Sequence, residues 1–252
     1  MLMLISPAKT LDLDTPYQLP HHTDPELLPQ AAELVAVLRQ KTPAELAELM
    51  QISDKLAYLN FTRYHDWQMP QPQDTRAALY TFMGDVYEGL DAASLDSAGQ
   101  LFTQRHLRIL SGLYGVLRPF DRMQAYRLEM GTRLLNPRGK NLYQFWGERI
   151  STTLHHTLTE MGSQQLINLA SEEYFKSVTA NPAFHIITPV FEEQKNGGYK
   201  VIAIHAKRAR GLMVRFAIDH RIQNPEQLKQ FDREGYRFTA EASDTHRWVF
   251  RR

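Results

Sequence analysis

The chain contains no cysteine, and this absence excludes several classes of protein. Disulfide frameworks, catalytic thiolates, thiol peroxidases and cysteine-ligated zinc or iron–sulfur centres all require a thiol. Any part that the chain plays in redox chemistry must therefore be indirect or use other ligands.

Long apolar runs are also missing. No uninterrupted apolar segment approaches the roughly 18 residues that cross a bilayer. The apolar run at residues 1–6 has no basic leader and no small-residue cleavage site, so it is typical of a strand rather than a signal peptide. We expect a cytoplasmic protein that does not interact with a membrane.

The chain has no overall excess of one charge, with 29 Lys and Arg against 28 Asp and Glu, but the charges are unevenly distributed. Residues 1–100 carry a net charge of −8, residues 101–150 +6, residues 151–200 −2 and residues 201–252 +5. Clustered cations attract polyanions such as nucleic acids. Alternatively, the basic and acidic segments pair with each other across the fold, and charge alone leaves the two interpretations open.

Helical signals dominate the first two thirds of the chain, and strand signals dominate the last third. We predict an α+β protein with one domain, residues 1–252, in which many helices pack around a mixed sheet that includes the N-terminal strand. Asn196-Gly197-Gly198 predicts a hairpin between its flanking strands. The predicted helices are 27–39, from 43, 53–67, 75–82, 97–110, 142–161, 209–221 and from 224, and the predicted strands are 1–6, 166–169, 186–191, 199–205, 236–238 and 248–250.

The histidines do not form a pattern typical of a metal site. His21-His22 and His155-His156 are adjacent in sequence, and neighbouring residues on a helix do not face one another. No His-x3-His or Glu-x2-His pair suggests a dedicated iron or zinc site. We therefore expect no metal ligands and no cofactor, and direct iron binding is the least favoured hypothesis.

Eight distinctive motifs run in order through the chain: ISPAKT from Ile5, ISDKLA from Ile52, GDVY from Gly84, LSGLYGVLRP from Leu110, YRLEMG from Tyr126, LYQFWG from Leu142, NLASEEYFKSV from Asn168 and AKRARG from Ala206. Together they closely resemble the motifs of the bacterial YaaA family of peroxide stress response proteins. The resemblance implies a cytoplasmic protein that limits oxidative damage by keeping free intracellular iron low. It also implies DNA binding, a basic cleft and a helix-hairpin-helix element, and it brings no settled catalytic reaction.

The candidate for the helix-hairpin-helix element is residues 110–118. Gly112 and Gly115 would let the backbone turn tightly and present N–H groups to a phosphate, with Arg108 and Arg118 beside them. From the residues alone, a structural turn is at least as good an interpretation. The resemblance favours binding to the phosphate backbone.

The cations Lys207, Arg208 and Arg210 follow an apolar strand and open the predicted helix 209–221. Cations at a helix start oppose the macrodipole unless an anion is bound, which favours a phosphate site over a solvated basic face.

Lys9 also follows a strand, at a place where ligand sites of open sheets gather. We place Arg127 and Lys176 in the same cleft, as further phosphate-binding candidates. If there is chemistry, Lys9 or Lys176 is the candidate nucleophile, and Glu129, Glu172 or Glu173 is the candidate acid, although structural ion pairs would explain these glutamates equally well.

The leading hypothesis is therefore a peroxide stress protein that binds DNA phosphates without sequence specificity. We expect a monomer, with DNA as its partner. The alternative is an enzyme that acts on damaged DNA or a nucleotide-like anion through a lysine nucleophile.

Overall fold

The N-terminal strand lies inside the sheet. The computed structural model describes residues 1–179 and 181–252. Strand β1 (Leu2–Ile5) consists of four buried apolar residues, as expected where both faces of a sheet are covered. It pairs in parallel with β4 on one side and β6 on the other. The prediction that the first strand joins a sheet with strands from the last third of the chain is confirmed.

The main sheet is mixed. Its strand order is β5-β4-β1-β6-β7-β10-β9, and β8 also pairs with β7. The strands from β4 to β10 along this order run parallel, whereas β5, β8 and β9 each pair antiparallel with their neighbour. The bounds are β4 Leu107–Ser111, β5 Gly115–Leu117, β6 Gln165–Leu169, β7 His185–Lys195, β8 Gly198–Lys200, β9 Arg237–Phe238 and β10 Arg247–Arg251; β2 (Thr10–Leu11) and β3 (Phe82–Met83) form a separate pair.

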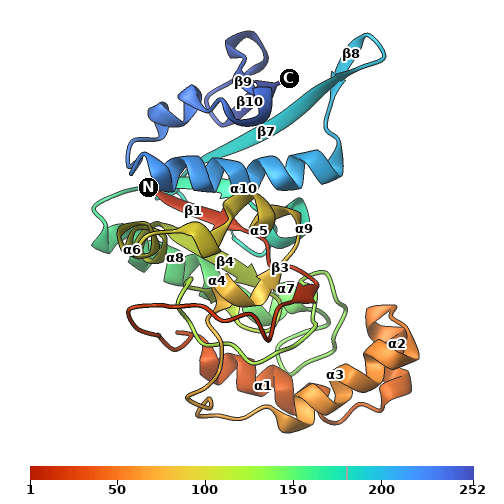
Figure 1. Ribbon diagram of the computed structural model, residues 1–252. Coiled ribbons are helices and arrows are strands. Elements are labelled where there is room, and N and C mark those ends of the chain that lie inside the picture. Colours follow the sequence, from red (N-terminus) through yellow and green to blue (C-terminus); the bar gives the residue numbers. More distant parts are fainter. Residues whose placement is uncertain (180) are drawn as a thin grey trace.

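The predicted hairpin is confirmed. Asn196 and Gly197 both have positive φ, 56° and 79°, as a two-residue turn between antiparallel strands requires. Figure 1 shows the β7–β8 hairpin reaching away from the body of the molecule. Its second strand ends at Lys200, so the prediction of a strand to residue 205 is wrong.

The helices confirm the α+β class. The α-helices are α1 Leu28–Leu38, α2 Pro43–Met50, α3 Asp54–Asp66, α4 Ala78–Thr81, α5 Asp85–Leu90, α6 Ser97–His106, α7 Leu142–Trp146, α8 Arg149–Glu160, α9 Glu172–Phe175 and α10 Ala203–Asp219, with short 3-10 turns at Ala92–Ser94, Pro225–Gln230, Arg233–Gly235 and Ala240–Ala242. Helices α1, α2 and α3 lie together at the end of the molecule opposite the β7–β8 hairpin (Figure 1). A capping box between Thr42 and Glu45 fixes the start of α2.

Two predicted helices are wrong in extent. The helix predicted over 97–110 ends at His106, because Leu107–Leu110 is a short buried run whose periodicity does not distinguish helix from strand. The helix predicted over 142–161 is interrupted at Gly147, whose φ of 51° ends α7 before α8 begins.

The expected helix-hairpin-helix element is not confirmed. Residues 110–118 form the end of β4, a tight turn and β5, with Ser111 paired to Gly115. A side chain at Gly112 would place its Cβ 2.1 Å from the carbonyl oxygen of Leu128, so this glycine is required for packing. The structural turn, which the sequence left open, is what the fold contains.

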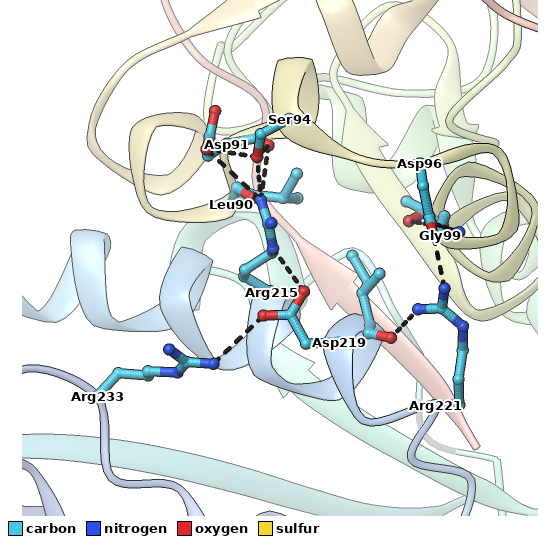
Figure 2. Close-up of polar contacts among 11 residues, drawn as sticks. Leu90, Asp91, Ser94, Asp96, Gly99, Arg215, Asp219, Arg221 and Arg233 are labelled. Carbon is cyan, nitrogen blue, oxygen red and sulfur yellow. Dashed lines mark hydrogen bonds and ion pairs between the residues drawn. The ribbon is translucent and has the colours of Figure 1, made fainter.

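Helix α10 begins at Ala203, six residues before its predicted start. It packs against α5 at two glycines: a Cβ on Gly211 would lie 1.8 Å from the carbonyl oxygen of Val86, and one on Gly89 would lie 2.3 Å from that of Arg208. Ion pairs at the carboxyl-terminal end of α10 connect it to the segment after α5 (Figure 2). This close contact fixes where the side chains of α10 point.

Candidate functional site

A pocket of about 440 Å³ opens where the parallel strands β1 and β6 end. Ser6 follows β1 and Ser171 follows β6, and the backbone N–H of Ser171 donates a hydrogen bond of 2.8 Å to Ser6 Oγ. Ligand sites of open sheets gather at the carboxyl ends of such strands. The predicted ligand loop after the first strand therefore does line a pocket.

Three buried tyrosines form much of the pocket wall. The hydroxyl of Tyr87 donates to the carbonyl oxygen of Ser6 (3.0 Å), and that of Tyr126 lies 2.6 Å from Ser111 Oγ. Burial raises the pKa of Tyr87, Tyr126 and Tyr174 above the usual range, so the hydroxyls stay protonated. These residues offer the pocket aromatic surface rather than acid–base groups.

Helix α10 contributes two cations, Lys207 and Arg210, to the pocket. They lie three residues apart and so share one helix face. Within the described residues, neither side chain has a hydrogen-bond or ion-pair partner, although Arg210 is half-buried and burial lowers its pKa. A desolvated guanidinium without a counterion is a favourable place for an anion.

Lys9, Arg127 and Glu129 form an ion-paired group at the same pocket. Lys9 Nζ lies 2.8 Å from Glu129 Oε1, and Arg127 Nη2 lies 3.2 Å from the same oxygen. The Nε of Arg127 is buried and has no partner among the described residues. One carboxylate thus occupies two cations that would otherwise be available to a ligand.

The pocket is mixed in charge rather than simply basic. Asp85, Glu129 and Glu173 line it together with the four cations Lys9, Arg127, Lys207 and Arg210. Glu173 Oε1 also accepts a 2.8 Å hydrogen bond from the backbone N–H of Gly131. The expected basic cleft is not confirmed, because three carboxylates line the pocket with the four cations and one of them, Glu129, pairs with both Lys9 and Arg127.

Other candidates lie outside the pocket. The side chains of Glu172 and Lys176 are exposed, and Lys176 Nζ lies 5.4 Å from the centre of the Tyr143 ring. Arg208 is paired with Glu234 at 2.7 Å. Successive side chains of a helix point to different faces, so neighbours in the sequence of α9 and α10 do not share the pocket.

The candidates around residues 108–118 are held within the fold. Arg108 is buried, and its Nη1 donates to the carbonyl oxygens of Gln104 and Leu107. Arg118 pairs with Asp121 at 2.9 Å, and Gly112 and Gly115 are buried in the β4–β5 turn. Three of these residues are thus buried and the fourth is ion-paired, so they lie apart from the pocket.

Sequence reasoning missed several residues that line the pocket. Asp85 and Tyr87 belong to the quoted GDVY motif but were given no role, and Ser171 precedes the candidate Glu172. A predicted helix that begins at residue 203 instead of 209 would have placed Lys207 and Arg210 on one helix face. Within residues 1–179 and 181–252, no three His, Asp or Glu side chains are grouped as a metal ion would require.

The chain was compared with known proteins. Residues 1–242 match the model of the family described as peroxide stress protein YaaA. The chain belongs to the YaaA family. A UPF0246 protein of Chromobacterium violaceum is 58% identical over 256 residues, which cover 100% of this chain and 99% of the relative. UPF0246 proteins of Azoarcus sp. (strain BH72) and Ralstonia nicotianae are 56% and 55% identical, again over 100% of this chain and 99% of the relative.

Membership in the YaaA family supports a role in peroxide stress. In the part of the chain that the structure describes, no helix is both long and apolar enough to cross a bilayer.

Proposed function

We propose that this protein acts in the cytoplasmic peroxide stress response by binding DNA, with its phosphate contacts at Lys207 and Arg210, the pocket cations without a partner among the described residues, and with Lys9 and Arg127, which pair with Glu129, beside them. The observation that carries the proposal is Arg210, a half-buried guanidinium that lines the pocket and has no counterion among the described residues. Guanidinium groups bind phosphate oxygens with two parallel donors. Lys207 lies on the same helix face and adds a second contact.

The test is the fluorescence anisotropy of a labelled DNA duplex titrated with protein at several salt concentrations. The variant Lys207→Gln/Arg210→Gln removes the two pocket cations that have no partner among the described residues, and Lys55→Gln, on the exposed face of α3, removes one charge elsewhere. Because each phosphate contact contributes about 0.9 to the slope of log affinity against log salt, the double variant is expected to lose roughly 2 from that slope. Lys55→Gln is expected to leave the slope unchanged.

Duplex binding that is indifferent to salt and to the double variant would contradict the proposal. No binding at low salt would also contradict it.

We further propose that DNA binding limits oxidative damage while free intracellular iron stays low, through a partner rather than through iron bound to this chain. The resemblance to the family motivates this step. Whole-cell electron paramagnetic resonance of chelated iron after peroxide addition would test it, in cells carrying either the parent protein or Lys207→Gln/Arg210→Gln. Equal iron signals in the two strains would separate DNA binding from the iron level.

A second candidate function is supported by the contact between Lys9 and Glu129. An amine beside a carboxylate can act as a nucleophile with a proton acceptor, and an abasic sugar offers an aldehyde to attack. Borohydride reduction in the presence of abasic DNA would trap the imine that forms with loss of water. A covalent adduct that disappears in Lys9→Gln would support the enzyme, and no adduct would remove it.

A further inference from the structure

We propose that the pocket takes one nucleotide, with its phosphate on Arg210 and Lys207 and its base against the buried tyrosine surface. This inference rests on the proposed function, since it names the part of the DNA that enters the pocket. The nucleotide comes from a strand end or an extruded position, or it is a free nucleoside monophosphate.

The size of the pocket favours a single unit. At about 440 Å³ it lies in the range of roughly 300–1,000 Å³ typical of small-ligand sites. A duplex instead displays phosphates about every 3.4 Å along each strand and is gripped along an extended surface. A pocket of this volume encloses one nucleotide, as in enzymes that take a base out of the stack.

The walls suit a base. Tyr87, Tyr126 and Tyr174 are only 8%, 5% and 8% exposed, and the hydroxyls of Tyr87 and Tyr126 are engaged within the protein. Their rings join Leu128 and Leu169 to make an apolar surface at the ends of the strands. Bases pack on aromatic side chains in this way when they leave a helix.

The charges distinguish a nucleotide from a bare phosphate. Carboxylates repel the negative charge of a bare phosphate, yet Asp85, Glu129 and Glu173 line this pocket beside the cations. Carboxylates accept hydrogen bonds from exocyclic amino groups such as that of cytosine. The combination therefore favours a nucleotide whose base carries an amino group.

The experiment measures how well small molecules displace a fluorescent duplex that carries a 3′ single-stranded extension. Deoxycytidine monophosphate, thymidine monophosphate, deoxycytidine and inorganic phosphate are compared at constant ionic strength. We expect deoxycytidine monophosphate to act at a concentration at least tenfold lower than phosphate or deoxycytidine, and thymidine monophosphate to be weaker. Calorimetry of deoxycytidine monophosphate with protein alone identifies binding of the free nucleotide, and a blunt duplex of the same length identifies the contribution of the strand end.

Two variants locate the site. Ala8→Phe places a ring at the pocket wall without changing charge, so it is expected to weaken nucleotide binding at least tenfold while leaving the salt slope of blunt-duplex binding intact. Arg210→Gln is expected to weaken nucleotide and duplex binding together, and Lys55→Gln to weaken neither. Thermal unfolding reports whether each variant is folded, and Arg210→Gln alone decides the matter if Ala8→Phe does not fold.

The outcomes separate this inference from the proposed function. Blunt and extended duplexes that bind equally, with no better displacement by the nucleotide than by phosphate, would overturn the inference and leave DNA binding in place. Nucleotide binding without any DNA binding would support the pocket assignment and remove the DNA function.

Discussion

The cations in the two halves of α10 differ in whether they have counterions. Near its start, Lys207 and Arg210 line the pocket and have no counterion within the described residues. Near its end, Arg215 contacts Asp219 at 2.7 Å and Asp91 at 3.5 Å (Figure 2). Lys207 and Arg210 are therefore available to a ligand, whereas Arg215 connects α10 to the segment after α5.

The same distinction between paired and unpaired cations applies to the basic block, residues 101–150. Several of its arginines form ion pairs across the fold: Arg118 with Glu26, Arg122 with Asp24 and Arg138 with Glu33. Pairing across the fold, one of the two interpretations that the sequence left open, therefore accounts for these three arginines. A count of cations along the sequence does not locate a binding surface, because pairing decides which of them are available.

The largest expected effect is the loss of the packing of α10 against α5, which positions both halves of the helix. Gly211→Ala would place its Cβ 1.8 Å from the carbonyl oxygen of Val86, where backbone has to move. We expect a loss of roughly 3 kcal/mol in the free energy of unfolding, at the upper end of overpacking costs, measured by urea denaturation. Gly198→Ala, which has nothing within 4 Å, is the control and is expected to change stability by less than about 0.5 kcal/mol.

A paired comparison of arginines tests the contrast directly. Arg215→Met is expected to lower stability by about 1 kcal/mol, because it removes the ion pairs with Asp91 and Asp219. Arg210→Met is expected to leave stability unchanged or raise it, because it removes a partly desolvated charge that has no counterion among the described residues. Only Arg210→Met is expected to weaken DNA binding. Equal losses of stability in the two variants would mean that Arg210 has a structural role.

A smaller effect is expected at Glu129, which occupies Lys9 and Arg127. Glu129→Gln removes the negative charge from both contacts. We expect duplex affinity in anisotropy titrations to rise roughly fivefold, about 1 kcal/mol, since the freed cations can then contact phosphate. Glu241→Gln, an exposed carboxylate with no ion pair among the described residues, is the control, and an equal gain there would reduce the effect to net charge.

The smallest expected effect is a dependence of stability on pH that arises from the buried side chain of His106. His106 is buried, and burial lowers its pKa below the usual histidine value of about 6.5. Below about pH 6.5 the unfolded chain binds a proton that the folded protein resists, so stability is full above that pH and falls as the pH drops towards the folded pKa. Urea denaturation between pH 7.5 and 5.5 should show a shallower decline in His106→Gln than in the parent.

Local signals predicted much of the fold. The capping box at Thr42 and Glu45 and the Asn196-Gly197 turn each fix an element through contacts between near neighbours. The apolar run at β1 is typical of a buried strand by its composition alone. The helix-hairpin-helix prediction at residues 110–118 was wrong because two glycines three apart suit a helical hairpin and a β turn equally. Gly112 is required by its close contact with the distant carbonyl oxygen of Leu128, which no local pattern indicates. Only a long-range contact decides between them.

The candidate site was predicted in part for the same reason. Lys9, Arg127, Glu129 and Lys207 were named because they follow strands or stand in charged motifs, and they do line one pocket. The aromatic wall was not foreseen, because buried tyrosines have no local pattern that distinguishes a pocket from a core. The start of α10 was missed because Val201 and Ile202 continue the apolar character of the preceding strand.

The position of β1 has a consequence for the making of the protein. This strand leaves the ribosome well before its partners, which are β4, about a hundred residues later, and β6, which ends at Leu169. Until then its four apolar residues have no sheet to enter, and pairings between such distant strands form slowly. A nascent chain that stops before β6 exposes the apolar centre of its sheet, so the core can close only after Leu169 has been synthesised.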